Sequence, residues 1–246
     1  MLGLIGGLMA SYKVRKRYNK TSVLDTGTTA KRYYKYGTLP NVDIYGDGIN
    51  IEDGIASGFG NECFLLTRPQ QITKYTPTAE NWEIVIKFKF TVSSHLQTLW
   101  YCAGVDYGSI ILIDTAKKLS LRAGNSTSSY NVANITGITV FEEGKIYWIK
   151  AEFTGTIYNI YSSVDGVSWT LENTKTSSTK LSMRGYERLG YYASSKDYTF
   201  MGSIDLSGCY YKVNGEYFWR GIQPEPATEN DYDYYEEYKV VSTYKE

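Results

Sequence analysis

The chain has 246 residues, and its 26 basic and 26 acidic side chains cancel to a formal net charge of zero. A neutral chain has no overall electrostatic reason to bind nucleic acid or an anionic membrane, so any such contact must be local. Three widely spaced cysteines and one histidine exclude a zinc-finger ligand set and a complete disulfide framework, and we expect buried, reduced thiols. The 25 tyrosines against 8 phenylalanines are typical of half-exposed sheet faces and interfaces.

Residues 1–40 are predicted to form an N-terminal arm. Met1–Ala10 is apolar, but it is about half as long as a membrane span and lacks the features of a signal peptide. We expect it either to lie on this protein's own surface or to insert into a partner. Ser11–Tyr36 carries eight basic residues and one acidic residue, a net charge of +7, together with five tyrosines. This pattern suits a nucleic-acid backbone or a protein interface, and a solvated arm is the plain alternative.

Residues 41–219 are predicted to form short strands separated by glycine turns and polar loops. The clearest strand is Trp82–Phe90, where every second residue is a large apolar one. Lys145–Leu171 predicts an antiparallel meander with strands at Ile146–Thr154, Thr156–Ser163 and Val167–Leu171. Further strands are predicted at Cys63–Leu66, Thr98–Gly104, Ser109–Asp114, Lys118–Ala123, Gly137–Phe141 and Arg188–Ala193. Gly124–Asn134 and Asn173–Lys180 are predicted loops, and no helical periodicity is present.

Three segments of this region resemble a known fold family. NWEIVIKFKF (81–90), GKIYWIKAEFTGTIYNIYSSVDGVSWT (144–170) and GSIDLSGCYYKVNGEYFW (202–219) follow one another as in the concanavalin A-like or laminin-G-like jelly-roll module, particularly the copies in bacteriophage virion and tail-fibre proteins. The resemblance implies an all-β fold, an antiparallel two-sheet jelly-roll sandwich with extended N- and C-terminal arms. Because this sandwich hosts sugar binders, glycanases, adhesion modules and inert spacers, it does not decide the function.

Residues 220–246 are predicted to form an acidic C-terminal tail. Residues 221–246 hold seven acidic and two basic residues, a net charge of −5, and five tyrosines. Glu237–Tyr244 has the composition of a strand that could add to a sheet edge. The opposite charges of arm and tail allow them to pair within one subunit or between neighbours. The predicted assembly residues are Tyr12, Arg15, Arg17, Tyr18, Tyr33, Tyr34, Tyr232, Tyr234, Tyr235 and Tyr238.

We expect the protein not to be an enzyme and to have no catalytic residues. Glycanases on this sandwich place two or three carboxylates at alternate positions of one strand. Here Glu83, Glu152 and Asp205 each stand alone on a predicted strand. The pairs Glu142-Glu143 and Glu236-Glu237 are adjacent and would point apart. His95 has no nucleophile motif around it.

The sequence contains candidate binding residues for two kinds of ligand, calcium and carbohydrate. Laminin-G-like modules often hold calcium at the rim of the sandwich, and loop oxygens are available at Asp47, Asp53, Asp106, Asp165 and Asp197. Most of these residues are better explained as turn residues, so we expect no metal and no cofactor, with calcium as the alternative. For a carbohydrate, the candidate binding residues are Trp100, Tyr101, Tyr107, Tyr130, Tyr191 and Tyr192.

Two functions follow. The first is a non-enzymatic structural virion protein of a bacteriophage, a tail, fibre, collar or capsid-decorating component anchored by its arms. Its partners would be copies of itself and other virion proteins, and it would be assembled in the bacterial cytoplasm. The alternative is a glycan-binding adhesin that recognises a carbohydrate of the host surface. We expect neither a nucleic-acid partner nor a membrane span.

Overall fold

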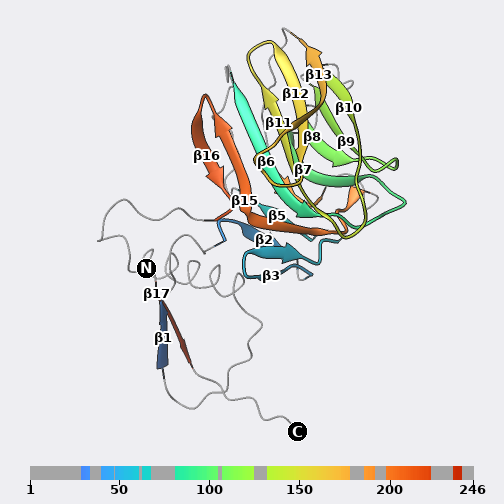
Figure 1. The fold of residues 1–246 in the computed structure, drawn as a ribbon. Coiled ribbons are helices and arrows are strands. Elements are labelled where there is room, and N and C mark those ends of the chain that lie inside the picture. The colour runs from blue at the N-terminus through green and yellow to red at the C-terminus, as the bar shows by residue number, and fades with distance from the viewer. Residues whose placement is uncertain are drawn as a thin grey trace.

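The structure is a computed structural model, and it describes residues 29–33, 40–46, 48–60, 63–67, 81–104, 107–124, 132–177, 186–191, 198–222 and 235–239. These residues form two large antiparallel sheets and one separate two-stranded sheet (Figure 1). The predicted all-β jelly-roll sandwich is therefore confirmed. Among the described residues we find no helical segment with the length and apolar character that a bilayer span requires.

The first large sheet has seven strands. Their spatial order is β10 (Ala133–Val140), β9 (Lys118–Gly124), β8 (Tyr107–Ile113), β7 (Gln97–Gly104), β14 (Tyr186–Leu189), β5 (Phe64–Leu66) and β2 (Asp43–Tyr45).

The second large sheet has eight strands. Their order is β13 (Thr170–Thr176), β12 (Ile157–Ser163), β11 (Ile146–Phe153), β6 (Trp82–Lys89), β15 (Ser203–Val213), β4 (Ile55–Ser57) and β3 (Asn50–Glu52) along the main path, with β16 (Glu216–Arg220) paired to β15. Because β6 occupies one side of β15, β16 must lie on the other side, the one where β4 pairs with the first part of β15.

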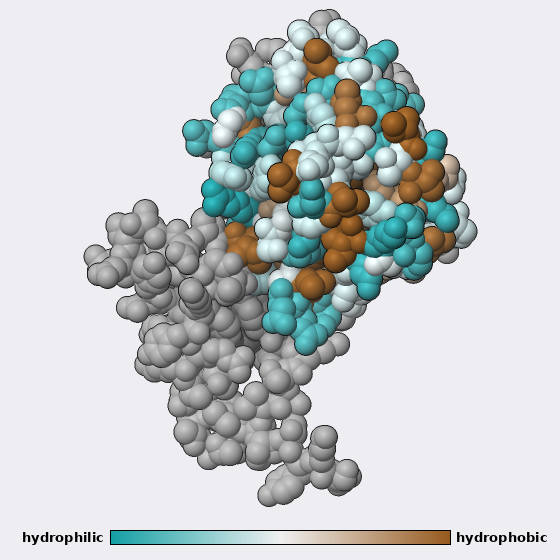
Figure 2. Space-filling model, viewed as in Figure 1, coloured by the Kyte–Doolittle hydropathy of each residue, from teal (hydrophilic) through white to brown (hydrophobic). Residues whose placement is uncertain are grey.

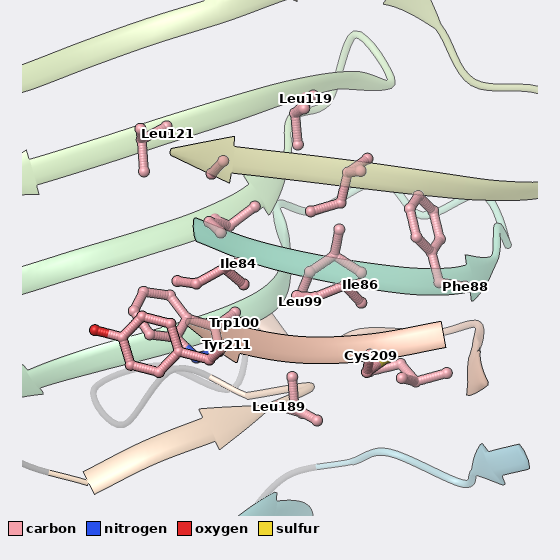
Figure 3. Close-up of a cluster of buried hydrophobic side chains, with 14 of the residues drawn as sticks. Ile84, Ile86, Phe88, Leu99, Trp100, Leu119, Leu121, Leu189, Cys209 and Tyr211 are labelled. Carbon is pink, nitrogen blue, oxygen red and sulfur yellow. The ribbon is translucent and has the colours of Figure 1, made fainter. Parts of the chain in front are cut away.

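The core lies between the two sheets, where the apolar side chains of alternating positions meet. In β6 and β11 the inward residues are those predicted from the alternation: Trp82, Ile84, Ile86 and Phe88, and Tyr147, Ile149, Ala151 and Phe153. Figure 3 shows side chains of both sheets pointing into this interior, with the rings of Trp100 and Tyr211 close together. Burial of each large side chain contributes about 1.5–3 kcal/mol.

Two tight hairpin turns join neighbouring strands of the second sheet. Asp53-Gly54 joins β3 to β4, and Asn214-Gly215 joins β15 to β16. All four residues have positive φ, which a two-residue turn of this hand requires and which Asn, Asp and Gly tolerate best.

A buried carboxylate closes one edge of the sandwich, where β13 of the second sheet packs against β10 of the first. Glu172 in β13 is only 4% exposed and accepts hydrogen bonds from the backbone N–H groups of Ile138 (2.7 Å) and Thr139 (2.8 Å). It also accepts one from the Ser162 hydroxyl at 2.5 Å. The N–H donors lie where the register of β10 shifts, so Glu172 satisfies backbone groups that lose regular strand partners there.

The predicted strand at Val167–Leu171 was misplaced, and the one predicted at Arg188–Ala193 lies earlier, as β14 at Tyr186–Leu189. The sequence predicted a strand at Val167–Leu171 and a loop at Asn173–Lys180, whereas β13 spans Thr170–Thr176. The reason is Asp165, whose carboxylate accepts hydrogen bonds from the N–H groups of Val167 (2.8 Å) and Ser168 (2.7 Å) and holds this segment in a turn. Likewise, β10 begins at Ala133, inside the predicted loop Gly124–Asn134.

None of the three cysteines, all of which the structure describes, forms a disulfide. Cys102 and Cys209 are buried, and Cys63 is partly buried against the core. Burial raises the pKa of the Cys209 thiol to about 12. Cys209 is therefore a neutral core residue, as predicted from the cysteine usage.

Candidate functional site

The outward side of the second sheet carries aromatic and charged residues in rows. The strand register sets three rows: Asn159, Glu152, Glu83, Lys212 and Tyr217; then Tyr161, Lys150, Val85, Tyr210 and Arg220; then Trp148, Lys87 and Asp205. Together with Trp169, which precedes β13, we call these residues the aromatic–charged face. They face outward because they alternate with core positions along each strand.

Glu152 is an ionised hydrogen-bond acceptor on this face. Its Oε1 accepts hydrogen bonds from Asn159 Nδ2 at 3.0 Å and from the Tyr161 hydroxyl at 2.8 Å. Lys150 Nζ lies 3.5 Å from Oε2. Burial opposes ionisation, but these hydrogen bonds and the Lys150 charge outweigh burial and lower the pKa of Glu152.

Each glutamate of the face accepts a hydrogen bond from a tyrosine hydroxyl, Glu152 from Tyr161 and Glu83 from Tyr210. Burial, and then the hydrogen bond to Glu152, raises the pKa of Tyr161 to about 12. Burial, and then the hydrogen bond to Glu83, also raises the pKa of Tyr210. Lys212 Nζ lies 3.6 Å from Oε1 of Glu83. Both tyrosines are therefore neutral donors at physiological pH.

Cationic side chains lie over the aromatic rings of the face. Lys150 Nζ is 4.2 Å from the ring centre of Tyr161 and 5.2 Å from that of Trp169. Lys212 Nζ is 4.9 Å from the ring centre of Tyr210 and 4.7 Å from that of Tyr217. These distances fall in the range of cation–π attraction, so the lysine side chains are held down across the sheet. Arg220 covers the Tyr217 ring at 3.7 Å in the same way.

One ion pair of the face is tight. Lys87 Nζ lies 2.6 Å from Oδ2 of Asp205 and 4.7 Å from the ring centre of Trp148. Burial opposes ionisation of Asp205, but the bonds from Lys87 and Ser207 outweigh it and lower its pKa. Asp205 lies at the register shift of β15, and its carboxylate accepts the backbone N–H of Ser207 at 3.0 Å. The ionised carboxylate therefore holds the backbone of β15 in place at this shift.

The face contains a pair of carboxylates that sequence reasoning missed. Glu83 in β6 and Glu152 in β11 are directly opposite in the register. The two residues lie on different strands, so no pattern within one strand marks them, and only the pairing of β6 with β11 brings them together. In a glycanase, one such group is a general acid with a raised pKa. The pKa of Glu152 is lowered, so this arrangement accepts hydrogen bonds, and the absence of catalysis stays a prediction.

The adjacent pair Glu142-Glu143 and the histidine lie in loops of the sandwich. Glu142 pairs with Lys145 at 2.7 Å, and Glu143 accepts the backbone N–H of Val92. These two carboxylates thus have different partners, as expected for adjacent residues. His95 is exposed in the loop before β7.

Of the predicted sugar-binding residues, the structure describes the side chains of Trp100, Tyr101 and Tyr191, and these three do not share one exposed surface. Trp100 is 1% exposed and packs 6.1 Å from Tyr211 in the core, so its ring offers no surface to a ligand. Tyr191 is 8% exposed and stacks on Phe64 at 5.4 Å. Tyr101 is half-buried and opposite Arg188 and Ile110 in the register of the first sheet. Tyr107 belongs to β8, and Tyr130 and Tyr192 lie outside the described residues.

The calcium candidates that are described are engaged in turns. Asp53 has φ 49° in the β3–β4 turn. Hydrogen bonds from the backbone of Ser168 and Val167 and from Ser163 hold the pKa of Asp165 well below its usual range. Asp47, Asp106 and Asp197 lie outside the described residues. Within the described part of the chain, no three His, Cys, Asp or Glu side chains are grouped closely enough to hold a metal ion.

The predicted assembly residues lie mostly outside the described ranges. Tyr33 is in β1 (Thr29–Tyr33), and Tyr235 and Tyr238 are in β17 (Tyr235–Lys239). These strands pair antiparallel with each other. The others, Tyr12, Arg15, Arg17, Tyr18, Tyr34, Tyr232 and Tyr234, are not described. An assembly role stays a prediction for all of them.

Comparisons with known proteins found no matching family model and no matching curated protein. Solved structures that are similar include the carbohydrate-binding module CBM40 of a Ruminococcus gnavus IT-sialidase bound to α2,3-sialyllactose, with 12% identity, a TM-score of 0.45, and coverage of 77% of this chain and 93% of that one. Domains LG4-5 of the mouse laminin α1 chain match with 11% identity and a TM-score of 0.44, and the match covers 92% of this chain and 52% of the laminin chain. A heptameric SAP-like pentraxin from Limulus polyphemus matches with 13% identity and a TM-score of 0.39, and the match covers 55% of this chain and 63% of the pentraxin chain. These are concanavalin A-like or laminin-G-like jelly-roll domains.

Proposed function

We propose that this protein is a glycan-binding module and that the aromatic–charged face is its binding surface. The observation that carries the proposal is the combination of side chains there. Trp148, Tyr161, Trp169, Tyr210 and Tyr217 supply rings, and the residues between them supply carboxylate, amide and ammonium groups. Rings that stack on the C–H faces of a sugar, beside acceptors and donors for its hydroxyls, are the usual means of carbohydrate recognition.

The two outer lysines are suited to contact a ligand. Lys150 and Lys212 lie 3.5 and 3.6 Å from their carboxylates, farther than the ~2.7–2.9 Å of a direct charged hydrogen bond. Turning an ammonium group toward a ligand hydroxyl would give up its cation–π contacts, at about 0.5–1 kcal/mol each, but would break no direct charged hydrogen bond. Lys87, at 2.6 Å from Asp205, is committed to its partner and has a structural role.

The exposed aliphatic side chains favour this mode of binding over a large apolar interface. On the side in view, Figure 2 shows brown apolar areas interspersed with teal and white polar ones. A stable protein partner usually requires a larger, contiguous core of apolar contact. A sugar needs a few rings with polar groups around them, as on the aromatic–charged face.

The test uses a pair of matched tyrosine variants of the full chain. Wild-type protein is first screened on an array of bacterial and host polysaccharides, and the affinity for the best ligand is measured by calorimetry. Tyr217→Ala should weaken binding about tenfold, or about 1.4 kcal/mol, because Tyr217 is 47% exposed on the face. Tyr45→Ala is the control, since Tyr45 is 53% exposed but belongs to the first sheet, where it stacks on Phe64 at 4.6 Å.

Two outcomes contradict the proposal. Either the wild-type chain binds none of the glycans, or the Tyr45→Ala and Tyr217→Ala variants lose affinity equally. The structural virion role and the location in a bacteriophage particle stay predictions from the sequence resemblance.

A further inference from the structure

The N-terminal arm and the C-terminal tail leave the sandwich at one point. The backbone N–H of Asn41 donates to Gly221 O at 2.7 Å, and its side-chain Nδ2 donates to Arg220 O at 3.0 Å. In return, Trp219 Nε1 donates to Asn41 O at 2.7 Å, and Pro40 forms an antiparallel bridge with Ile222. The two ends of the sandwich are thus joined by hydrogen bonds from both sides.

The arm and the tail pair a second time beyond this junction. Strand β1 pairs antiparallel with β17, with Thr29 opposite Lys239 and Tyr33 opposite Tyr235 (Figure 1). This pairing has the same antiparallel sense as the Pro40–Ile222 bridge. β1 and β17 therefore form one two-stranded sheet between the two terminal regions, and we call these two strands the terminal ribbon.

The register of the terminal ribbon matches opposite charges. Strand β1 contains Lys31 and Arg32, and β17 contains Glu236 and Glu237. The pairing places Lys31 opposite Glu237 and Arg32 opposite Glu236. Opposite charges at facing positions stabilise a strand pair, and like charges destabilise it.

A two-stranded sheet is marginally stable by itself and leaves one open edge on each strand. Among the described strands, none other pairs with β1 or β17. Contact between two β1 edges, or between two β17 edges, would put strands of like charge side by side. Contact of a β17 edge with a β1 edge repeats the charge pattern already present inside the ribbon.

We propose that the terminal ribbon is an assembly surface whose partner is a second copy of this chain, with β17 of one copy adding to β1 of the next. This contact is heterologous, so it continues until a ring closes or a string forms. It is independent of glycan binding, which we place on the aromatic–charged face of the sandwich.

The experiment uses full-length chains and sedimentation equilibrium over a range of protein and salt concentrations. Wild-type chain should have an average mass that rises with protein concentration and falls with added salt, because the contact is electrostatic. Reversing the arm charges (Lys31→Glu with Arg32→Glu) or the tail charges (Glu236→Lys with Glu237→Lys) should each leave a monomer. The fourfold variant with both reversals should associate again.

A matched control distinguishes this contact from an effect of overall charge. Lys89→Glu with Lys175→Glu makes the same charge change as the arm reversal, on two exposed lysines of the sandwich, and should leave association unchanged. A wild-type chain that is monomeric throughout would refute the proposal. Association that persists in both the arm-reversed and tail-reversed variants would also refute it, as would failure of the fourfold variant to associate while its sandwich unfolds at the wild-type temperature.

Discussion

The buried carboxylate of Glu172 gives the sharpest prediction for a single residue. Glu172→Ala leaves the donors at Ile138, Thr139 and Ser162 without their acceptor, so we expect a loss of about 2–3 kcal/mol in the free energy of unfolding. Glu172→Gln keeps the size but replaces one acceptor with a donor and should have an intermediate effect. Urea denaturation at neutral pH measures both losses.

The effect of Glu172 should depend on pH. Burial opposes its ionisation, but hydrogen bonds from Ser162, Thr139 and Ile138 lower its pKa below the ordinary 4.5. The contribution of the ionised group is thus complete above about pH 4.5 and is lost as the pH falls through the lower, folded-state pKa. The difference between wild type and Glu172→Gln should shrink at about pH 3. A difference that stays constant down to that pH would show that the charge is not involved.

The sequence does not determine which of two neighbouring aromatic residues on a strand is buried. Alternation places neighbours such as Trp100 and Tyr101 on opposite sides of β7, but it does not say which side is covered. Trp100 is in the core, while the aromatic rings of the face, such as Tyr217, were not among the predicted binding residues. Only the packing of one sheet on the other separates a core ring from an exposed one.

At the level of elements, strong alternation of apolar residues and tight-turn dipeptides were sufficient to predict where strands begin and end. The predicted Trp82–Phe90 and Ile146–Thr154 correspond to β6 and β11 within one residue, and the Asn214-Gly215 dipeptide, a typical hairpin sequence, forms the turn between β15 and β16. β13 was misplaced because its residues, TLENTKT, lack alternation, and its position depends on the Asp165 turn and on Glu172. Contacts that are distant in sequence therefore define the edge strand.

Two turn glycines should differ when changed to alanine. Gly215 has φ 86° and nothing near an added Cβ, so Gly215→Ala should cost about 1 kcal/mol through backbone strain alone. Gly166 has a similar φ of 75°, but its Cβ would lie 3.0 Å from the ring of Trp148. Gly166→Ala should therefore cost more and should also change tryptophan fluorescence. Equal losses of unfolding free energy would contradict the packing of this turn on Trp148.

At the scale of the whole molecule, the sequence predicted the sandwich and the charged ends, but not how they are connected. The resemblance of three segments was sufficient for the jelly roll, because their order reflects the strand order of the fold. The carboxylate pair of the aromatic–charged face and the junction of Asn41 with Gly221 each join residues far apart in the chain. No local pattern marks such pairs, since strand register is set by the whole core.

The connection of the two ends changes where an independent domain should be cut. A fragment of residues 40–222 should unfold cooperatively under reducing conditions with a chelator, because both inner sheet faces and the free cysteines lie within it. A fragment of residues 41–219, the boundaries predicted from sequence, lacks the Pro40–Ile222 bridge and both hydrogen bonds from Asn41 to Arg220 and Gly221. The hydrogen bond from the Gly221 N–H to Cys209 O is lost as well, so at about 1 kcal/mol for each of the three bonds the shorter fragment should be less stable by about 3 kcal/mol. Thermal and urea unfolding of the two fragments measure this difference. Equal stability would mean that the junction contributes nothing to the sandwich, and a longer fragment without cooperative unfolding would mean that the sandwich is not a domain by itself.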